Sequence, residues 1–151
     1  MDFKTYYHGP GEAVLPEEVV RFVTDSIGKL KFTFAHGCST KLREKILCSL
    51  RTQGWSDKVR LSAGSKITIT AMRGNIALCL QTGNMSRFYA DLLKLQYLFQ
   101  NGKVAAAIYI VPTKRRAKEM GSNLAHFERF IEELELFREI IAVPTLVIGL
   151  D

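Results

Sequence analysis

Cysteine is scarce in this chain of 151 residues, and long apolar runs are absent. The three cysteines form no Cys-x-x-Cys pair, which argues against a disulfide framework and is typical of reduced thiols in a cytosol. No eighteen consecutive residues are apolar, so no segment is a candidate for crossing a membrane. The first fourteen residues also lack the apolar segment of a signal peptide. We therefore expect a soluble, cytoplasmic protein without a membrane partner.

Internal repeats, low-complexity tracts and linkers rich in proline and glycine are also absent. Hydrophobic residues make up 47% of the chain, which is enough for one compact domain with a sizeable core. We therefore expect a single domain over residues 1–151. Within it, residues 1–37 should supply an N-terminal helix and strand, and residues 38–151 the main core.

Positive charge is concentrated in the middle of the chain. Residues 38–75 hold eight Lys/Arg against two Asp/Glu, a net +6 that equals the formal charge of the whole protein. Such an excess is typical of a protein that binds a phosphate-rich partner. A solvated basic face without any partner is the alternative interpretation.

The hydrophobic periodicity predicts alternating helices and strands. Helices are expected near residues 16–28, 40–53, 84–100 and 123–140, and strands at residues 31–36, 58–63, 66–72, 75–81, 104–112 and 145–150, after an irregular start. Ser39 or Thr40 should cap the second helix, and Asn84 the third. The tight turn at residues 73–75 joins the last two strands of a three-strand meander, and parallel crossovers follow. This order predicts an α/β fold with a mixed sheet covered by helices on both faces.

The strand ITIT, a tight turn, the strand end CLQTGN and the helix MSRFYADLLKLQ follow one another between residues 67 and 96. This order resembles the PD-(D/E)XK nuclease core, and in particular the branch that contains the BglII-type restriction endonucleases. In that branch a strand with an Asp precedes a strand with Glu-x-Gln, a Gly-Asn break and a helix. Later pieces, IVPTK, GSNLAHFERF and VPTLVIG, are similar too, so the resemblance spans roughly residues 40–150 and implies a restriction-endonuclease-like core.

The resemblance places the metal-binding Asp of that branch at Thr70 and its Glu at Cys79, with Gln81 at the Gln. Both carboxylates are therefore missing. Magnesium needs hard oxygen ligands and is usually held by carboxylates, whereas a thiol suits softer metals. We interpret Thr70, Cys79 and Gln81 as a degenerate site without catalytic residues, metal or cofactor. A magnesium cofactor is expected only if the acids have moved elsewhere.

Other chemistry at the cysteines has little support from the spacing. A nucleophilic Cys79 would need a base such as His36 or His126, and no pattern brings either histidine close. A zinc site from His36, Cys38, Cys48 and Cys79 fits no standard ligand spacing. A buried structural thiol is the simpler interpretation of Cys79.

Relocated acids are also hard to find. Glu44 has Lys41 and Lys45 beside it on its helix, as in a surface ion pair. Asp91 is expected to lie too far along its helix to reach the strand end. The acidic residues between 132 and 139 alternate with apolar ones, as on a solvated helix face.

Residues that could bind nucleic acid are better retained than the acids. The candidates are Lys41, Lys45, Arg73, Asn84, Arg87, Lys114, Arg115, Arg116 and Lys118. The run 114–118 follows the strand ending at Pro112, which the implied fold places beside the strand with Gln81, so this run should border the cleft. A solvated loop is the alternative for the run. Arg87 lies near a helix N-terminus, where phosphate is favoured.

Together these observations favour a catalytically inactive, nuclease-like protein that binds double-stranded DNA. It would act as a regulator, a plasmid or phage accessory factor, or a competitor of an active enzyme. One alternative is a protein-interaction or inhibitor module on the same fold. The second is a divalent-metal-dependent endonuclease with relocated acids, which the missing Asp and Glu oppose. The resemblance also implies a homodimer formed through helices beside the site.

Overall fold

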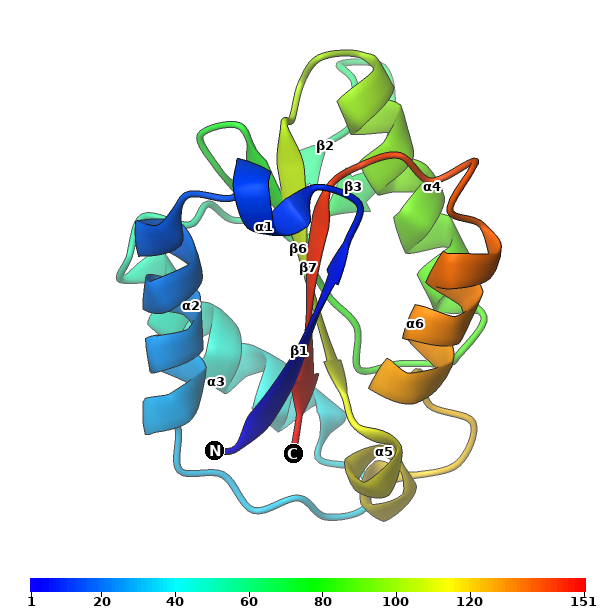
Figure 1. Cartoon of the computed structure of the whole chain (residues 1–151). Coiled ribbons are helices and arrows are strands. Elements are labelled where there is room, and N and C mark those ends of the chain that lie inside the picture. Colours follow the sequence, from blue (N-terminus) through cyan, green and yellow to red (C-terminus); the bar gives the residue numbers. More distant parts are fainter.

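A five-stranded mixed sheet runs through the centre of the computed structural model, which describes all 151 residues (Figure 1). Its strands, in order across the sheet, are β1 (Phe3–His8), β7 (Thr145–Leu150), β6 (Ala106–Pro112), β5 (Ile76–Leu80) and β4 (Ala71–Arg73). β5, β6 and β7 are parallel, and β1 and β4 are antiparallel edge strands. The expected mixed α/β sheet is confirmed.

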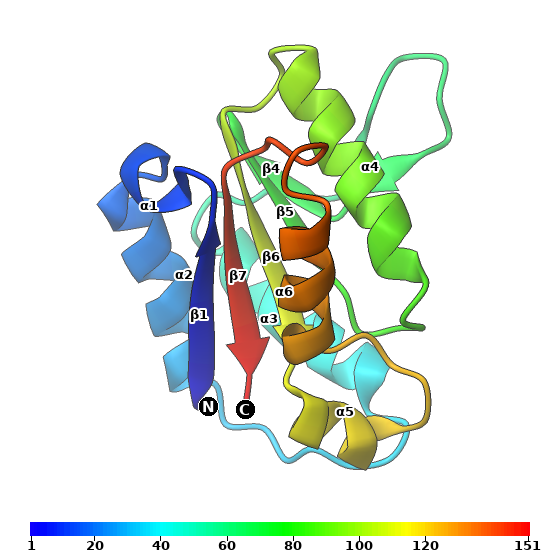
Figure 2. The same cartoon turned by 45° about the vertical axis from the view of Figure 1, so that its right-hand side comes forward.

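Helices cover both faces of this sheet (Figure 2). They are α1 (Gly11–Val14), α2 (Glu17–Lys29), α3 (Ser39–Arg51), α4 (Arg87–Gln100), α5 (Lys114–Met120) and α6 (Phe127–Leu136). On one face, Ile27 and Ile46 from α2 and α3 belong to the same buried cluster as Leu78 of β5. On the other, Phe88 of α4 and Phe130 of α6 are buried with the alternate sheet residues. The three parallel strands are buried on both faces, so their sequences are nearly continuously apolar. No helix is both long and apolar enough to cross a membrane.

The N-terminal part of the chain differs from the sequence expectation. The strand expected at residues 31–36 is an extended loop between α2 and α3. Its alternation has another cause, because Phe32 and Phe34 pack edge-on against each other, 5.5 Å between ring centroids, and both pack against the core. The start of the chain, expected to be irregular, forms β1 and occupies the sheet edge beside β7.

The expected three-strand meander is divided between two sheets. β2 (Val59–Arg60) and β3 (Thr68–Ile69) pair with each other in a separate two-stranded sheet, whereas β4 pairs with β5. The chain bends at Thr70, between β3 and β4. The Thr70 hydroxyl accepts a hydrogen bond from the backbone N–H of Leu80 at 3.2 Å, which fixes the bend against the end of β5.

Two helix starts also differ from expectation. Neither Ser39 nor Thr40 caps α3, because the N-cap position is Cys38 and no side chain caps the helix. α4 begins after Ser86 rather than at Asn84. The Asn84 Oδ1 atom accepts hydrogen bonds from the backbone N–H and the hydroxyl of Ser86, so Asn84 stabilises the turn that leads into α4.

The C-terminal half contains one helix more than the periodicity predicted. The basic run 114–118 is not a loop but the first part of α5, which Thr113 caps by accepting a hydrogen bond from the Arg116 backbone N–H. The helix expected over residues 123–140 is shorter, because α6 begins after the cap His126 and ends at Leu136.

Candidate functional site

A cleft of about 580 Å³ opens at the carboxyl end of β5. It is lined by the start of α3, the first two turns of α4, β3, the last residue of β5 and the segment 81–83 that follows it. Only three of its fifteen lining residues are hydrophobic, so it suits a polar ligand. The carboxyl ends of parallel strands are the usual place for ligands in α/β sheets.

The charged side chains of this cleft come mainly from two helices. Arg87, Asp91 and Lys94 lie on one stripe of α4, four and three residues apart, and Arg43 extends from α3. Lys58, just before β2, completes the set. Four basic groups therefore face the cleft with a single acidic one.

Asp91 is the centre of a buried hydrogen-bond network. Its Oδ2 atom accepts from the Gln81 amide at 2.6 Å and from the Tyr109 hydroxyl at 3.2 Å, and its Oδ1 atom accepts from Lys94 Nζ at 3.0 Å. The Gln81 carbonyl oxygen in turn accepts from the backbone N–H of Gly83. The expectation that Asp91 lies too far from the strand end is therefore wrong. The turn before α4 brings the first two turns of the helix over the end of β5.

Arg43 is bonded to two oxygen atoms in the lining of the cleft. Its guanidinium donates hydrogen bonds to the backbone carbonyl of Leu80 and, at 3.3 Å, to the Thr70 hydroxyl. The side chain is half-buried, and this burial lowers the pKa of Arg43, while the nearby Asp91 carboxylate acts in the opposite direction. The oxygens of Leu80 and Thr70 thus already have a cationic partner.

Cys79 lies beneath the cleft rather than in its lining. The side chain is buried in the core between the sheet and α4. Burial, with a smaller contribution from the Asp91 charge, raises the pKa of the Cys79 thiol, so the group stays neutral at ordinary pH. A neutral buried thiol is a poor nucleophile.

The donor atoms of the cleft do not fit a magnesium ion. The one carboxylate is already bonded to an amide, a phenol and an ammonium group. Nowhere in the chain do three or more His, Cys, Asp or Glu side chains form a group placed to hold a metal ion. Magnesium sites use hard, charged oxygen ligands, and here two cations, Arg43 and Lys94, lie among the available oxygens.

The cleft includes only some of the residues expected to form the site. Thr70, Gln81 and Arg87 line it, whereas Lys41, Lys45, Arg73 and Asn84 do not. Lys45 donates to the Lys31 carbonyl and lies over the Phe32 ring, and Arg73 lies over the Phe22 ring. Arg43, Asp91 and Lys94 were missed as site residues. The spacing of Arg87, Asp91 and Lys94 was the signal that could have placed two of these three.

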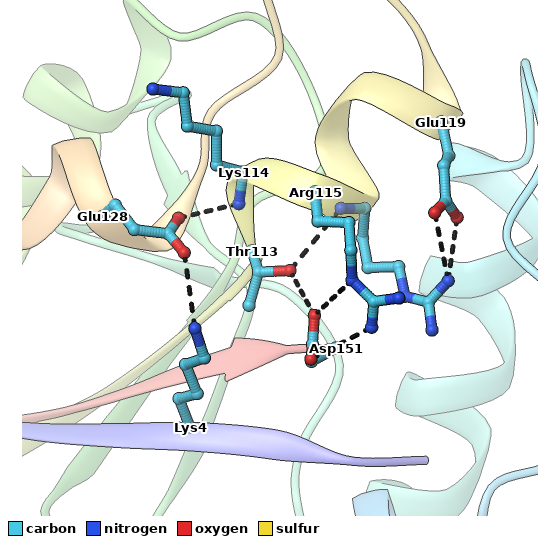
Figure 3. Close-up of polar contacts among 8 residues, drawn as sticks. Lys4, Thr113, Lys114, Arg115, Glu119, Glu128 and Asp151 are labelled. Carbon is cyan, nitrogen blue, oxygen red and sulfur yellow. Dashed lines mark hydrogen bonds and ion pairs between the residues drawn. The ribbon is translucent and has the colours of Figure 1, made fainter.

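The basic run on α5 does not line the cleft either, although β6 lies beside β5 as expected. Arg115 pairs with Asp151 at 3.1 Å and Arg116 with Glu119 at 2.9 Å. Figure 3 shows the side chain of Arg115 directed at Asp151, whereas Lys114 bonds Glu128 only through its backbone N–H and its ammonium group points away. Half of the run's charge is therefore already paired with carboxylates.

Comparison with known proteins identifies the family. The family model of restriction endonuclease BglII/BglIII matches residues 3–150. The chain belongs to this restriction endonuclease family. The match includes β1, so the BglII-type resemblance expected for residues 40–150 is confirmed and extends over nearly the whole chain.

Two solved structures share the fold of this BglII/BglIII family member. Restriction endonuclease BglII complexed with a DNA 16-mer gives a TM-score of 0.90 at 11% sequence identity, covering 100% of this chain and 78% of that one. Free BglII gives 0.80 at 12% identity, covering 100% and 80%. Among curated proteins, none matches the chain in sequence. At such identities the likeness establishes the fold, and the function must be argued from the residues of the cleft.

Proposed function

We propose that the protein binds double-stranded DNA without cutting it. The observation that supports this most is the state of the cleft, in which Asp91 is the single carboxylate and is fully engaged by Gln81, Tyr109 and Lys94. Metal-assisted hydrolysis needs an ion to generate a nucleophilic water and to stabilise the charge that develops in the transition state. This cleft offers such an ion too few acidic ligands.

The basic character of the same region supports DNA as the partner. Four basic side chains face the cleft, and residues 38–75 carry a net charge of +6. The structurally similar BglII was solved in complex with DNA. Binding of this kind would suit a regulator, a plasmid or phage accessory factor, or a competitor of an active enzyme.

The proposal includes a homodimer. α4 exposes Tyr89, Leu93 and Tyr97 at successive spacings of four residues, and Leu93 is 66% exposed. Such a stripe lies next to the cleft-facing stripe of the same helix, so a second copy there would place two clefts on one assembly. The same apolar stripe would serve the interaction-module alternative if the partner were another protein.

One observation favours the endonuclease alternative. Asp91, a relocated acid, lies in the cleft beside Gln81 and Lys94. A hydrolytic site built on it would use one carboxylate where the family pattern has two, so activity would have to be metal-dependent and abolished by Asp91→Asn.

Fluorescence anisotropy with a labelled duplex and a plasmid-nicking assay, each with magnesium and with EDTA, separate these functions. We expect binding that EDTA does not change, that weakens with salt by roughly 0.9 logarithmic units of slope per phosphate contact, and that produces no nicks. Metal-dependent nicking that disappears in Asp91→Asn would establish the endonuclease instead. Absence of duplex binding at low salt would reject the DNA function and leave the interaction module.

A further inference from the structure

We infer that the cleft at the end of β5 binds a phosphate group directly, with Arg43 and Lys94 supplying the positive charge and no metal ion taking part. The inference rests on the proposed function in one respect, namely that the phosphate belongs to the DNA backbone. It names the point of contact and its chemistry, which DNA binding by a basic surface does not specify.

Arg43 is held in position with donors to spare. Its guanidinium is fixed by the Leu80 carbonyl and the Thr70 hydroxyl, which use two of its five N–H groups. The planar fork of an arginine matches two phosphate oxygens. Because the side chain is half-buried and its pKa is lowered by burial, the charge has lost part of its hydration, and a bound anion would compensate for that loss.

Lys94 provides the second charge from the opposite wall. One of its three N–H groups is bonded to the Asp91 Oδ1 atom at 3.0 Å, and its side chain is 24% exposed. The other Asp91 oxygen is occupied by Gln81 and Tyr109, so the carboxylate orients the ammonium group and is itself neutralised by it.

The remaining walls are favourable for an anion. Asp91 is the single acid of the cleft and is paired with Lys94. The other three basic groups therefore have no acidic partner within the cleft; they are Arg43, Lys58 and Arg87. The first residues of α3 also line it, and no side chain caps that helix. An uncapped helix N-terminus adds positive potential where Arg43 begins its second turn. The volume of about 580 Å³ is large enough for a phosphate with its attached sugar.

Two neutralising variants and one matched control test the inference. Arg43→Gln and Lys94→Gln each remove one cation from the cleft, and Arg138→Gln removes one from an exposed position outside the cleft. In EDTA, we expect each cleft variant to weaken duplex binding by about 10-fold or more and to flatten the salt slope by about one unit. The control should stay within about twofold of the wild type, because its charge lies outside the phosphate contact.

Inorganic phosphate is the second probe. Titration of the wild type, followed by NMR in EDTA, should shift the backbone amides of residues 39–43 and 81–83, and both cleft variants should abolish the shifts. A wild type that shows these shifts but binds no duplex would reject the DNA function and keep the phosphate site. Duplex binding with an unchanged affinity and slope in the cleft variants would reject the phosphate site and keep the DNA function.

Folding of the variants is checked by circular dichroism and thermal unfolding. Arg43→Gln loses two internal hydrogen bonds, so it is the variant at greater risk of unfolding. Lys94 bonds only Asp91 and is partly exposed, so Lys94→Gln should fold and decides the question alone if Arg43→Gln does not. Binding by the wild type that requires a divalent ion would also overturn the inference.

Discussion

Replacement of Asp91 by alanine should be among the most destabilising single changes near the cleft. The residue is 8% exposed, and its Oδ2 atom is the acceptor for the Gln81 amide and the Tyr109 hydroxyl, both of which are buried. Each buried donor left without an acceptor costs about 1–3 kcal/mol, so the two together should cost about 2–6 kcal/mol. Lys94 should add little, because its partly exposed ammonium group can turn to water. Most domains have only about 5–15 kcal/mol of stability in total.

Two further variants provide the comparison. Asp91→Asn keeps the size and one carbonyl acceptor, so we expect it to cost about 1–3 kcal/mol, less than alanine. Asp57→Ala removes an acid whose side chain is 80% exposed and paired with Arg51, and this should cost less than about 1 kcal/mol. Both acids have a basic partner, so the difference in stability between Asp91→Ala and Asp57→Ala reports mainly the effect of burial.

Urea unfolding followed by circular dichroism measures these differences. With an m-value of about 2 kcal/mol/M that does not change between variants, the Asp91→Ala midpoint should fall by about 1–3 M. Adding Tyr109→Phe to Asp91→Ala should recover about 1 kcal/mol, because it removes one of the unpaired groups. An Asp91→Ala variant as stable as Asp57→Ala, or no recovery in the double variant, would refute the network.

Two other predictions follow from the titrating cysteine and the basic helix. The pKa of Cys79 is raised in the folded state above its unfolded value, so at high pH the folded protein keeps a proton that the unfolded chain loses. The free energy of unfolding should therefore fall by about 1.4 kcal/mol per pH unit above pH ~8.5. Urea unfolding at pH 8 and 10 should show this loss in the wild type and a smaller one in Cys79→Ala; equal losses would contradict it. Replacing Lys114 and Lys118 with alanine should flatten the salt slope of duplex binding by at most about two units, and replacing Arg115 as well should add little because it is paired with Asp151. A larger flattening on removal of Arg115 would mean that this pair opens on DNA.

The core of the fold was predictable because its signal is local. β5, β6 and β7 are buried on both faces, which requires nearly continuous apolar sequence, and the helices between them carry clear apolar stripes. The edge of the sheet was not predictable in this way. β1 is an edge strand, reads FKTYYH and is mostly only partly buried, with no alternation between its faces. It therefore carries a weaker pattern than the loop 31–36, whose two phenylalanines alternate without pairing to any strand.

Only the part of the candidate site that lies on consecutive strands could be predicted from the sequence. Thr70, Cys79 and Gln81 could be assigned because the resemblance orders them along two consecutive strands, and the structure places all three at the end of β5 or the bend facing it. Arg43 and Asp91 belong to helices that approach this point from opposite sides. Their meeting depends on the turn before α4 and on the packing of α3, which no local pattern encodes.

If the protein binds DNA as proposed, a cleft without metal-binding acids would bind phosphate whether or not a divalent ion is present. A divalent ion held by carboxylates leaves the cleft negative when the ion dissociates, so DNA affinity depends on metal supply. Here Arg43 and Lys94 would supply fixed charge, and the family resemblance assigns Thr70 to a position where an acid would repel phosphate. Neither cation can generate a nucleophilic hydroxide from water, since each lacks the open coordination position of a metal. A cleft built in this way should bind DNA with or without a divalent ion, still more weakly at high salt, and leave the phosphodiester bond intact.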